Sequence, residues 1–321
     1  MTASTGSILV LRALGLGDLL TAVPALRALR RGFPDADITL AAPSWLATVL
    51  PLTGAVDQLL PTPDMDELGP LRSQPDLAVN LHGRGPQSIA ALRRTGAVRI
   101  VSHRHPDHPD VDGPDWTDDL HEVLRWCRLV EAAGLVSDPA DLHLARPSSD
   151  ALVAGTVVVH PGASSGARRW PWRRFASVAA TLAQRGHHVV VTGTTAEAEL
   201  CRVLVQGAEL PGERDLAGRL DLDQLAALIA AASLVICGDT GVAHLASGYG
   251  TPSVVLFGPT SPARWGPPAG GPHAVLWSGS VGDPHAATLD PGLAAITVDE
   301  VLTAIDGRLA RAGRSSPHPV G

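Results

Sequence analysis

The chain has 321 residues, which is the length of two ordinary domains rather than one. Charged residues make up 18% of it and the formal net charge is −7, with both signs interspersed, so nothing indicates a nucleic-acid partner. All 25 basic residues are arginine, which excludes mechanisms that need a Schiff-base or P-loop lysine.

The first half of the chain alternates short apolar runs with helical patterns. Residues 8–12, "ILVLR", have the pattern of a buried parallel strand. The glycines of "GLGD" end that strand, and apolar residues then recur at helical spacing from Leu19 to Leu29. Further strands are expected at 38–42, 76–81 and 98–102. This order predicts an α/β domain with a mostly parallel sheet.

A polar, turn-rich stretch separates this half from a second one of the same kind. We place a linker near residue 150, with one domain at 1–148 and another at 149–321. Strands are expected in the second domain at 156–160, 188–193, 234–239 and 253–260, with a capped helix at 221–232. Two Rossmann-like domains are expected to face one another across a cleft at the carboxyl ends of their strands. Packing of the last helix back onto the first domain stays open.

Cysteine usage and hydropathy favour a soluble, cytoplasmic protein. The three cysteines are far apart in apolar sequence, which predicts neither a disulfide framework nor a zinc site. The opening "MTASTGS" lacks the features of a secretory signal, and no run reaches the roughly 18 apolar residues of a spanning helix. A peripheral membrane contact stays open.

Polar residues cluster in "CGDTGVAH", where an apolar strand gives way to a helix near Gly241. Asp239 and Thr240 then lie at a helix amino terminus, whose free N–H groups bind anions. The alternative is an ordinary N-cap without a ligand. His244 favours the ligand, because four-residue spacing puts it on the side of Thr240.

A second small-residue loop, "HPGASSGARRW", carries Ser164 and Arg168 between a strand and a helix. Small residues allow close backbone approach and arginine neutralises a diphosphate, although a solvated surface loop has the same composition. Glu197 follows the next strand, where a carboxylate binds ribose hydroxyls or merely occupies the first turn of a helix.

The amino-terminal loop lacks a nicotinamide fingerprint, because Gly15 and Gly17 have no third glycine at the required spacing. It does carry Asp18, a carboxylate at a sharp turn between strand and helix. Taken by itself, an aspartate at this position would be interpreted as the N-cap of the helix that follows. The Asp-x-Asp pairs and the "HRHPDHPD" loop lie in turns, and we infer no metal from them.

With these residues in hand the chain resembles glycosyltransferase family 9, the lipopolysaccharide heptosyltransferases and their relatives. The resemblance runs through 8–40, 160–175 and 215–267, and its most specific part is "GDTGVAH" with the later "GTP" and "LFGPT". It implies a GT-B fold and transfer of a sugar from a nucleoside diphosphate donor, with inversion at the anomeric carbon and without a catalytic metal or other cofactor.

The resemblance also implies roles for the candidate residues. Asp18 becomes the general base. The donor-binding residues become Ser164, Arg168, Glu197, Asp239, Thr240, Gly241 and His244. The acceptor-side residues become Gly17, His82 and Arg84, although exposed loop residues often have no such role. Arg168 stands where the family usually has lysine, which keeps the charge but changes its geometry.

The expected partners are therefore an ADP-heptose-like donor and a glycan, lipid-linked or specialised-metabolite acceptor. The acceptor, the nucleotide base and the oligomeric state stay open. Two alternatives share the architecture, a nucleotide-sugar epimerase and a nucleotide-binding module without catalysis. Asp18 argues against the second of these.

Overall fold

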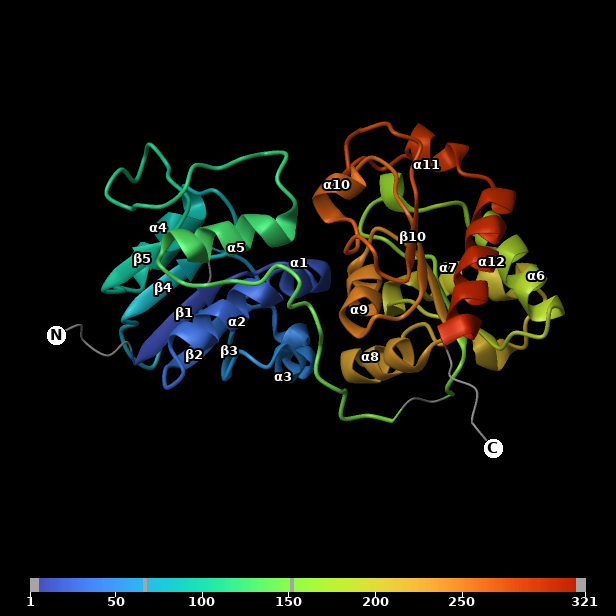
Figure 1. Ribbon diagram of the computed structural model, residues 1–321, viewed down its shortest axis with the longest axis horizontal. Coiled ribbons are helices and arrows are strands. Elements are labelled where there is room, and N and C mark those ends of the chain that lie inside the picture. The colour runs from blue at the N-terminus through green and yellow to red at the C-terminus, as the bar shows by residue number, and fades with distance from the viewer. Residues whose placement is uncertain (1–5, 66–67, 151–152, 316–321) are drawn as a thin grey trace. The chain divides into compact units, whose positions relative to one another are not determined.

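The structure, a computed structural model, describes residues 6–65, 68–150 and 153–315. It divides into two compact units, Met1–Ala145 and Arg146–Gly321, so the division lies just before the expected boundary after residue 148. Residues 151–152 of the expected linker lie outside the described part. Each unit is a parallel five-stranded sheet with helices on its faces, which confirms the predicted α/β class (Figure 1).

The sheet of the first unit has the strand order β3-β2-β1-β4-β5, and all its pairs are parallel. Its strands are β1 (Ser7–Leu11), β2 (Asp37–Ala42), β3 (Gln58–Pro61), β4 (Leu77–Asn80) and β5 (Arg99–Val101). The sequence pattern missed β3, a short edge strand. Because β1 is central, the loop that follows it emerges between the loops that follow β2 and β4.

The helices of the first unit are α1 (Leu16–Thr21), α2 (Val23–Gly32), α3 (Leu50–Thr53), α4 (Gln87–Arg94) and α5 (Glu122–Ala132), with a 3₁₀ turn η1 (Ser44–Val49). The single helix expected from Leu19 to Leu29 is interrupted at Ala22. Pro24 explains the interruption, because proline has no N–H for a continuing ladder but fits the first turn of a new helix.

The second unit has the strand order β10-β9-β8-β6-β7. Its strands are β6 (Val157–His160), β7 (Val189–Val191), β8 (Leu234–Gly238), β9 (Ser253–Leu256) and β10 (His273–Leu276). The strands β6 and β8 are buried along their whole length, as expected of apolar runs in a sheet covered on both faces. The half-exposed edge strand β10 was not expected from the sequence.

The helices of the second unit are α6 (Trp172–Gln184), α7 (Ala198–Gly207), α8 (Leu222–Ala231), α9 (Gly241–Tyr249), α10 (Pro262–Trp265), α11 (Pro291–Ala295) and α12 (Val298–Ser315), with 3₁₀ turns η2 (Gly166–Arg168), η3 (Thr195–Glu197) and η4 (Gly212–Arg214). The expected cap of α8 is present, since Asp221 accepts the N–H of Gln224 at 2.8 Å. The helix α12 packs on α6, β9 and β10 of its own unit.

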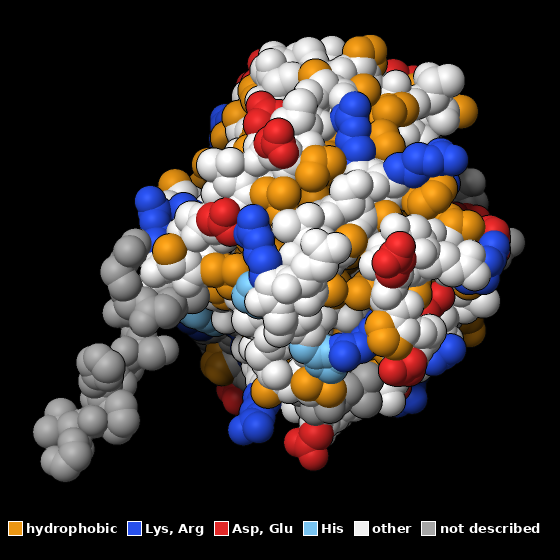
Figure 2. All heavy atoms as spheres, turned by 90° about the vertical axis from the view of Figure 1, so that its right-hand side faces the viewer, with side chains coloured by type: hydrophobic (Ala, Val, Ile, Leu, Met, Phe, Trp, Pro, Cys, Tyr) orange, Lys and Arg blue, Asp and Glu red, His pale blue; other side chains and the backbone are white. Residues whose placement is uncertain are grey.

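The surface in Figure 2 intersperses arginine and acidic side chains and shows no patch of one sign. Within the described ranges, no helix combines the length and hydropathy needed to cross a membrane.

Candidate functional site

Asp18 lies in the first turn of α1, directly after the central strand of the first sheet. Its Oδ2 accepts the N–H of Gly15 at 3.2 Å, so Asp18 is the third residue of the helix in a capping box, and the N-cap is Gly15 rather than Asp18. Its Oδ1 lies 3.5 Å from Nη2 of Arg12, and 29% of the side chain is exposed. The cap therefore occupies one carboxylate oxygen and leaves part of the group open to a substrate.

The proposed acceptor-side residues surround the same edge of the sheet. The loop after β4 carries His82, which is half-buried, and Arg84, which is exposed; Gly17 is part of the first turn of α1. Burial first, and the charge of Arg12 second, lower the pKa of His82 to about 4. Its Nδ1 is buried without a hydrogen-bond partner among the described residues. His82 is thus neutral at pH 7 and has a free ring nitrogen.

The start of α9 has an N-cap residue whose side chain does not cap the helix. Thr240 occupies the N-cap position in an extended conformation, yet its side chain makes no capping hydrogen bond. Its hydroxyl is buried and makes no hydrogen bond to a nitrogen or oxygen atom of the described residues, although it interacts with the thiol of Cys237. The first N–H groups of any helix have no partner inside it. The side chain of Thr240 therefore does not provide the cap that was considered as an alternative to a ligand site.

Arg168 lies against this helix start and faces Asp239. Its Nη2 is 2.9 Å from Oδ2 of Asp239 and also donates to the main-chain oxygen of Asp239. The Asp239 side chain is 5% exposed and that of Arg168 is 23% exposed. The Nε of Arg168 is buried and makes no hydrogen bond to the described residues. The pair is close to neutral, and Nε is the atom of Arg168 that keeps a donor without a partner among the described residues.

Other contacts also hold the loop before α6. Ser165 donates to the carbonyl of Pro284 at 2.6 Å, and Nε of Arg169 donates to the carbonyl of Ala163 at 2.9 Å. Ser164 is exposed and lies 3.4 Å from Nη1 of Arg168. Of the two neighbouring arginines, only Arg168 contacts the start of α9.

Glu197 lies in the 3₁₀ turn after β7 and caps it. This is the structural role that was considered as the alternative to ribose binding. Its Oε2 accepts the N–H and the hydroxyl of Thr194 at 2.8 and 2.9 Å. A Cβ at Gly162 would approach the carboxylate to 2.0 Å, so glycine is needed where the two loops meet. The pKa of the buried His160 is lowered by burial and raised, to a smaller extent, by Glu197. Glu197 thus lies against the loop that carries Arg168.

His244 lies one turn into α9, as its spacing predicted. Its ring packs edge-on against that of Trp265 in α10, with 6.0 Å between the ring centroids. Trp265 is a lone tryptophan in a proline-rich loop, and no local sequence pattern indicates its contact with His244.

Arg12 also went unrecognised, although it ends the apolar run "ILVLR" and is only 1% exposed. A charged residue that closes a buried strand was the available signal, because such a group is rarely buried without a partner.

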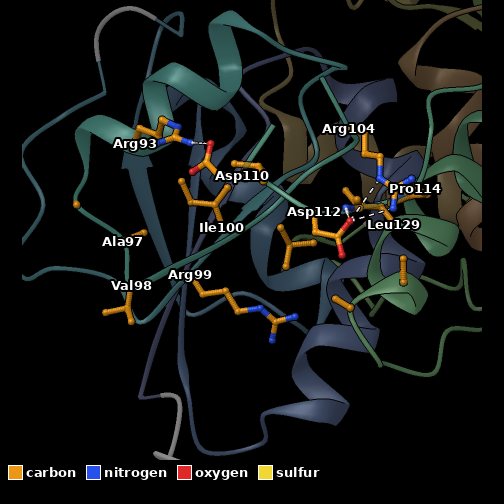
Figure 3. Close-up of a pocket in the computed structure, with 16 residues that line it drawn as sticks. Arg93, Ala97, Val98, Arg99, Ile100, Arg104, Asp110, Asp112, Pro114 and Leu129 are labelled. Atoms are coloured by element: carbon orange, nitrogen blue, oxygen red, sulfur yellow. Dashed lines mark hydrogen bonds and ion pairs between the residues drawn. The ribbon is translucent and has the colours of Figure 1, made fainter. Parts of the chain in front are cut away.

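A separate hollow of about 710 Å³ lies beside the edge strand β5 (Figure 3). Ion pairs join Arg93 to Asp110 and Arg104 to Asp112 on its walls. None of the residues expected to contact the acceptor lines it. Within the described ranges, no three His, Cys, Asp or Glu side chains form a metal-binding group.

Comparison with known proteins points to one family of glycosyltransferases. A model of glycosyltransferase family 9 (heptosyltransferase) matches residues 118–282. Lipopolysaccharide heptosyltransferase 2 of Escherichia coli is 36% identical over 106 residues, which is 32% of this chain and only 30% of that protein. Lipooligosaccharide heptosyltransferase 2 of Haemophilus influenzae is 24% identical over 313 residues, 82% of this chain and 86% of that one.

The fold has a solved counterpart. The structure of E. coli ADP-heptose lipopolysaccharide heptosyltransferase II has a TM-score of 0.77 and 23% identity, covering 96% of this chain and 99% of that one. This likeness confirms the GT-B class expected from the sequence.

Proposed function

The chain belongs to glycosyltransferase family 9, and we propose that it transfers a sugar, with inversion, from an ADP-heptose-like donor to an acceptor hydroxyl. The observation that supports the proposal is the start of α9, where Thr240 does not cap the helix and Arg168 pairs with Asp239 directly before it. The matched family region contains both residues. The ADP-heptose named for the solved counterpart supports the choice of donor.

In this proposal the second unit stabilises the leaving group. As the bond from the anomeric carbon to the diphosphate oxygen breaks, its electron pair leaves with the nucleoside diphosphate. The N–H groups at the start of α9 and the guanidinium of Arg168 stabilise the developing charge. Asp239 orients Arg168 through the 2.9 Å ion pair rather than touching phosphate, since two anions repel each other. The other donor contacts in this proposal come from Thr240, Gly241, His244 and Ser164. Glu197 lies against the loop that carries Arg168.

The first unit activates the acceptor. Asp18 removes the proton of the acceptor hydroxyl as its oxygen attacks the anomeric carbon, so one C–O bond forms while the other breaks. The partly exposed carboxylate fits this role. Gly17, His82 and Arg84 bind the acceptor in this proposal. A neutral His82 accepts or donates a hydrogen bond to a sugar hydroxyl without adding charge beside Asp18.

We propose that no metal takes part, because helix N–H groups and an arginine do the electrostatic work that a cation would do. The proposed acceptor is a cell-envelope glycan or a specialised metabolite, reached from the cytoplasm.

The experiment is product analysis with and without an acceptor. With ADP-heptose and a core-oligosaccharide acceptor, we expect ADP release that depends on the acceptor and a product of inverted anomeric configuration. Turnover of the donor alone would identify an epimerase instead. Binding of ADP without any turnover across a panel of acceptors would favour the non-catalytic alternative. A thermal-shift series with ADP, UDP, GDP and dTDP identifies the base, because ligands stabilise the native state that binds them.

A further inference from the structure

Beneath Asp18 lies a buried polar cluster that the mechanism above does not use. It begins with Arg12, the residue that follows β1, whose side chain is 1% exposed. The Nε of Arg12 donates to the main-chain carbonyl of Asp18 at 2.5 Å, and Nη2 lies 3.5 Å from Oδ1 of the same residue. Nη1 donates to the carbonyl of Leu81, at the end of β4. One guanidinium therefore contacts both the backbone and the carboxylate of Asp18.

Glu122, at the start of α5, holds this guanidinium in place. Its Oε1 accepts Nη2 of Arg12 at 3.2 Å and the indole N–H of Trp126 at 2.9 Å. The Arg12 guanidinium also lies over the Trp126 ring, 4.7 Å from its centroid. The planar group is thus fixed by a carboxylate at one edge and an aromatic face below it.

Arg125 fixes Glu122 in turn. Its Nε donates to Oε2 of Glu122 at 3.1 Å, and its remaining donors bond the carbonyls of Thr117, Asp118 and Leu120. The cluster contains two guanidinium groups but one buried carboxylate. The second carboxylate near it is that of Asp18, so the two guanidinium groups face the carboxylates of Glu122 and Asp18.

We propose that Arg12 and Glu122 are positioning residues for the general base: Glu122 orients Arg12, and Arg12 fixes the place and direction of the Asp18 carboxylate. The inference rests on the proposed function. The guanidinium lies beside Oδ1 and the N–H of Gly15 holds Oδ2, so the direction of the carboxylate is fixed while its exposed part meets the acceptor hydroxyl. Misplacement of a catalytic group by about 1 Å lowers rates by as much as a hundredfold.

The test is a double-mutant cycle in the full chain, with kcat for transfer as the readout. Arg12→Lys keeps the charge but cannot contact both Asp18 and Glu122, so we expect kcat to fall about tenfold to a hundredfold. The KM for the donor and the affinity for ADP should not change. Glu122→Gln should act in the same direction with a smaller effect. In the Asp18→Asn background both changes should alter kcat by less than about twofold, because no base remains to be positioned.

The matched control is Arg27→Lys. Arg27 is another partly buried arginine of the first unit that donates to a main-chain carbonyl, that of Thr53 at 2.8 Å, but it contacts none of the site residues. It should leave kcat unchanged. If Arg12→Lys does not fold, Glu122→Gln and Trp126→Phe give the same cycle, since each removes one hydrogen bond of the cluster.

Three outcomes separate the claims. Loss of kcat that disappears in the Asp18→Asn background supports the inference. Loss by the same factor in both backgrounds, or a fall that follows melting temperature alone, assigns the cluster to folding and overturns it. A wild-type chain that transfers no sugar contradicts the proposed function itself.

Discussion

Replacing Arg168 with alanine separates the binding role of this residue from its structural role. The Asp239 carboxylate, 5% exposed, would lose its ion-pair partner. Removing one partner of a buried pair costs about 3–5 kcal/mol of stability, because an uncompensated charge remains. Affinity for ADP should fall by about 1.5–3 kcal/mol, the value of a hydrogen bond to a charged group.

A second variant distinguishes the two effects. Arg168→Ala with Asp239→Asn removes the stranded charge, so it should recover much of the stability but none of the ADP affinity. Arg169→Ala is the matched control, since Arg169 belongs to the same loop, is exposed, and its side chain donates to the carbonyl of Ala163 rather than to Asp239. Denaturant unfolding gives the free energy of unfolding, and calorimetric titration with ADP gives the affinity. Unchanged ADP affinity in Arg168→Ala would refute the assignment of this residue to the donor site.

Three further predictions concern metal, pH and the first residues of the second unit. Transfer should persist in excess EDTA, and activity that is lost and then restored by magnesium would contradict the metal-free proposal. Burial first, and nearby arginines second, lower the pKa of both His82 and His103 from 6.5 to about 4. Protonation therefore favours the unfolded chain, and stability that is full above about pH 6.5 is lost toward pH 4, by up to about 1.4 kcal/mol per pH unit and group. Urea unfolding at pH 7, 5.5 and 4.5 measures this, and a slope unchanged in His103→Phe would exclude His103 as a source. Asp223 accepts the N–H groups of Ser148 and Ser149 at 3.1 and 2.7 Å. Asp223→Ala should therefore lower the free energy of unfolding by about 1–3 kcal/mol. An unaltered urea midpoint would show that these two hydrogen bonds do not stabilise the fold.

Local patterns were sufficient to predict most of the fold. Apolar runs predicted both central strands, and the turn at Gly241 predicted the start of α9, because strand burial and helix capping depend on neighbouring residues. The edge strands β3 and β10 were not predicted, because they are short and half-exposed and so lack a clear apolar run. Pro24 was visible in the sequence, and the break in the first helix was still not predicted.

Contacts between distant residues could not be predicted in the same way. Asp239 was expected to contact the donor, but its partner in the structure is Arg168, 71 positions earlier. Arg12 and Glu122 are 110 positions apart and meet only because the fold brings the start of α5 close to the residue that follows the central strand. No spacing rule relates such residues, so the positioning of Asp18 became visible only in the structure.

The most direct test of the proposed chemistry is the rate of transfer by Asp18→Asn at saturating donor and acceptor. Asparagine keeps nearly the same shape and still accepts the N–H of Gly15, so melting temperature and ADP affinity should stay close to those of the wild type. Asparagine does not take up the acceptor proton, and kcat should fall by about a hundredfold to ten-thousandfold. A folded, ADP-binding Asp18→Asn chain that transfers sugar at the wild-type rate would contradict the assignment of Asp18 as the base.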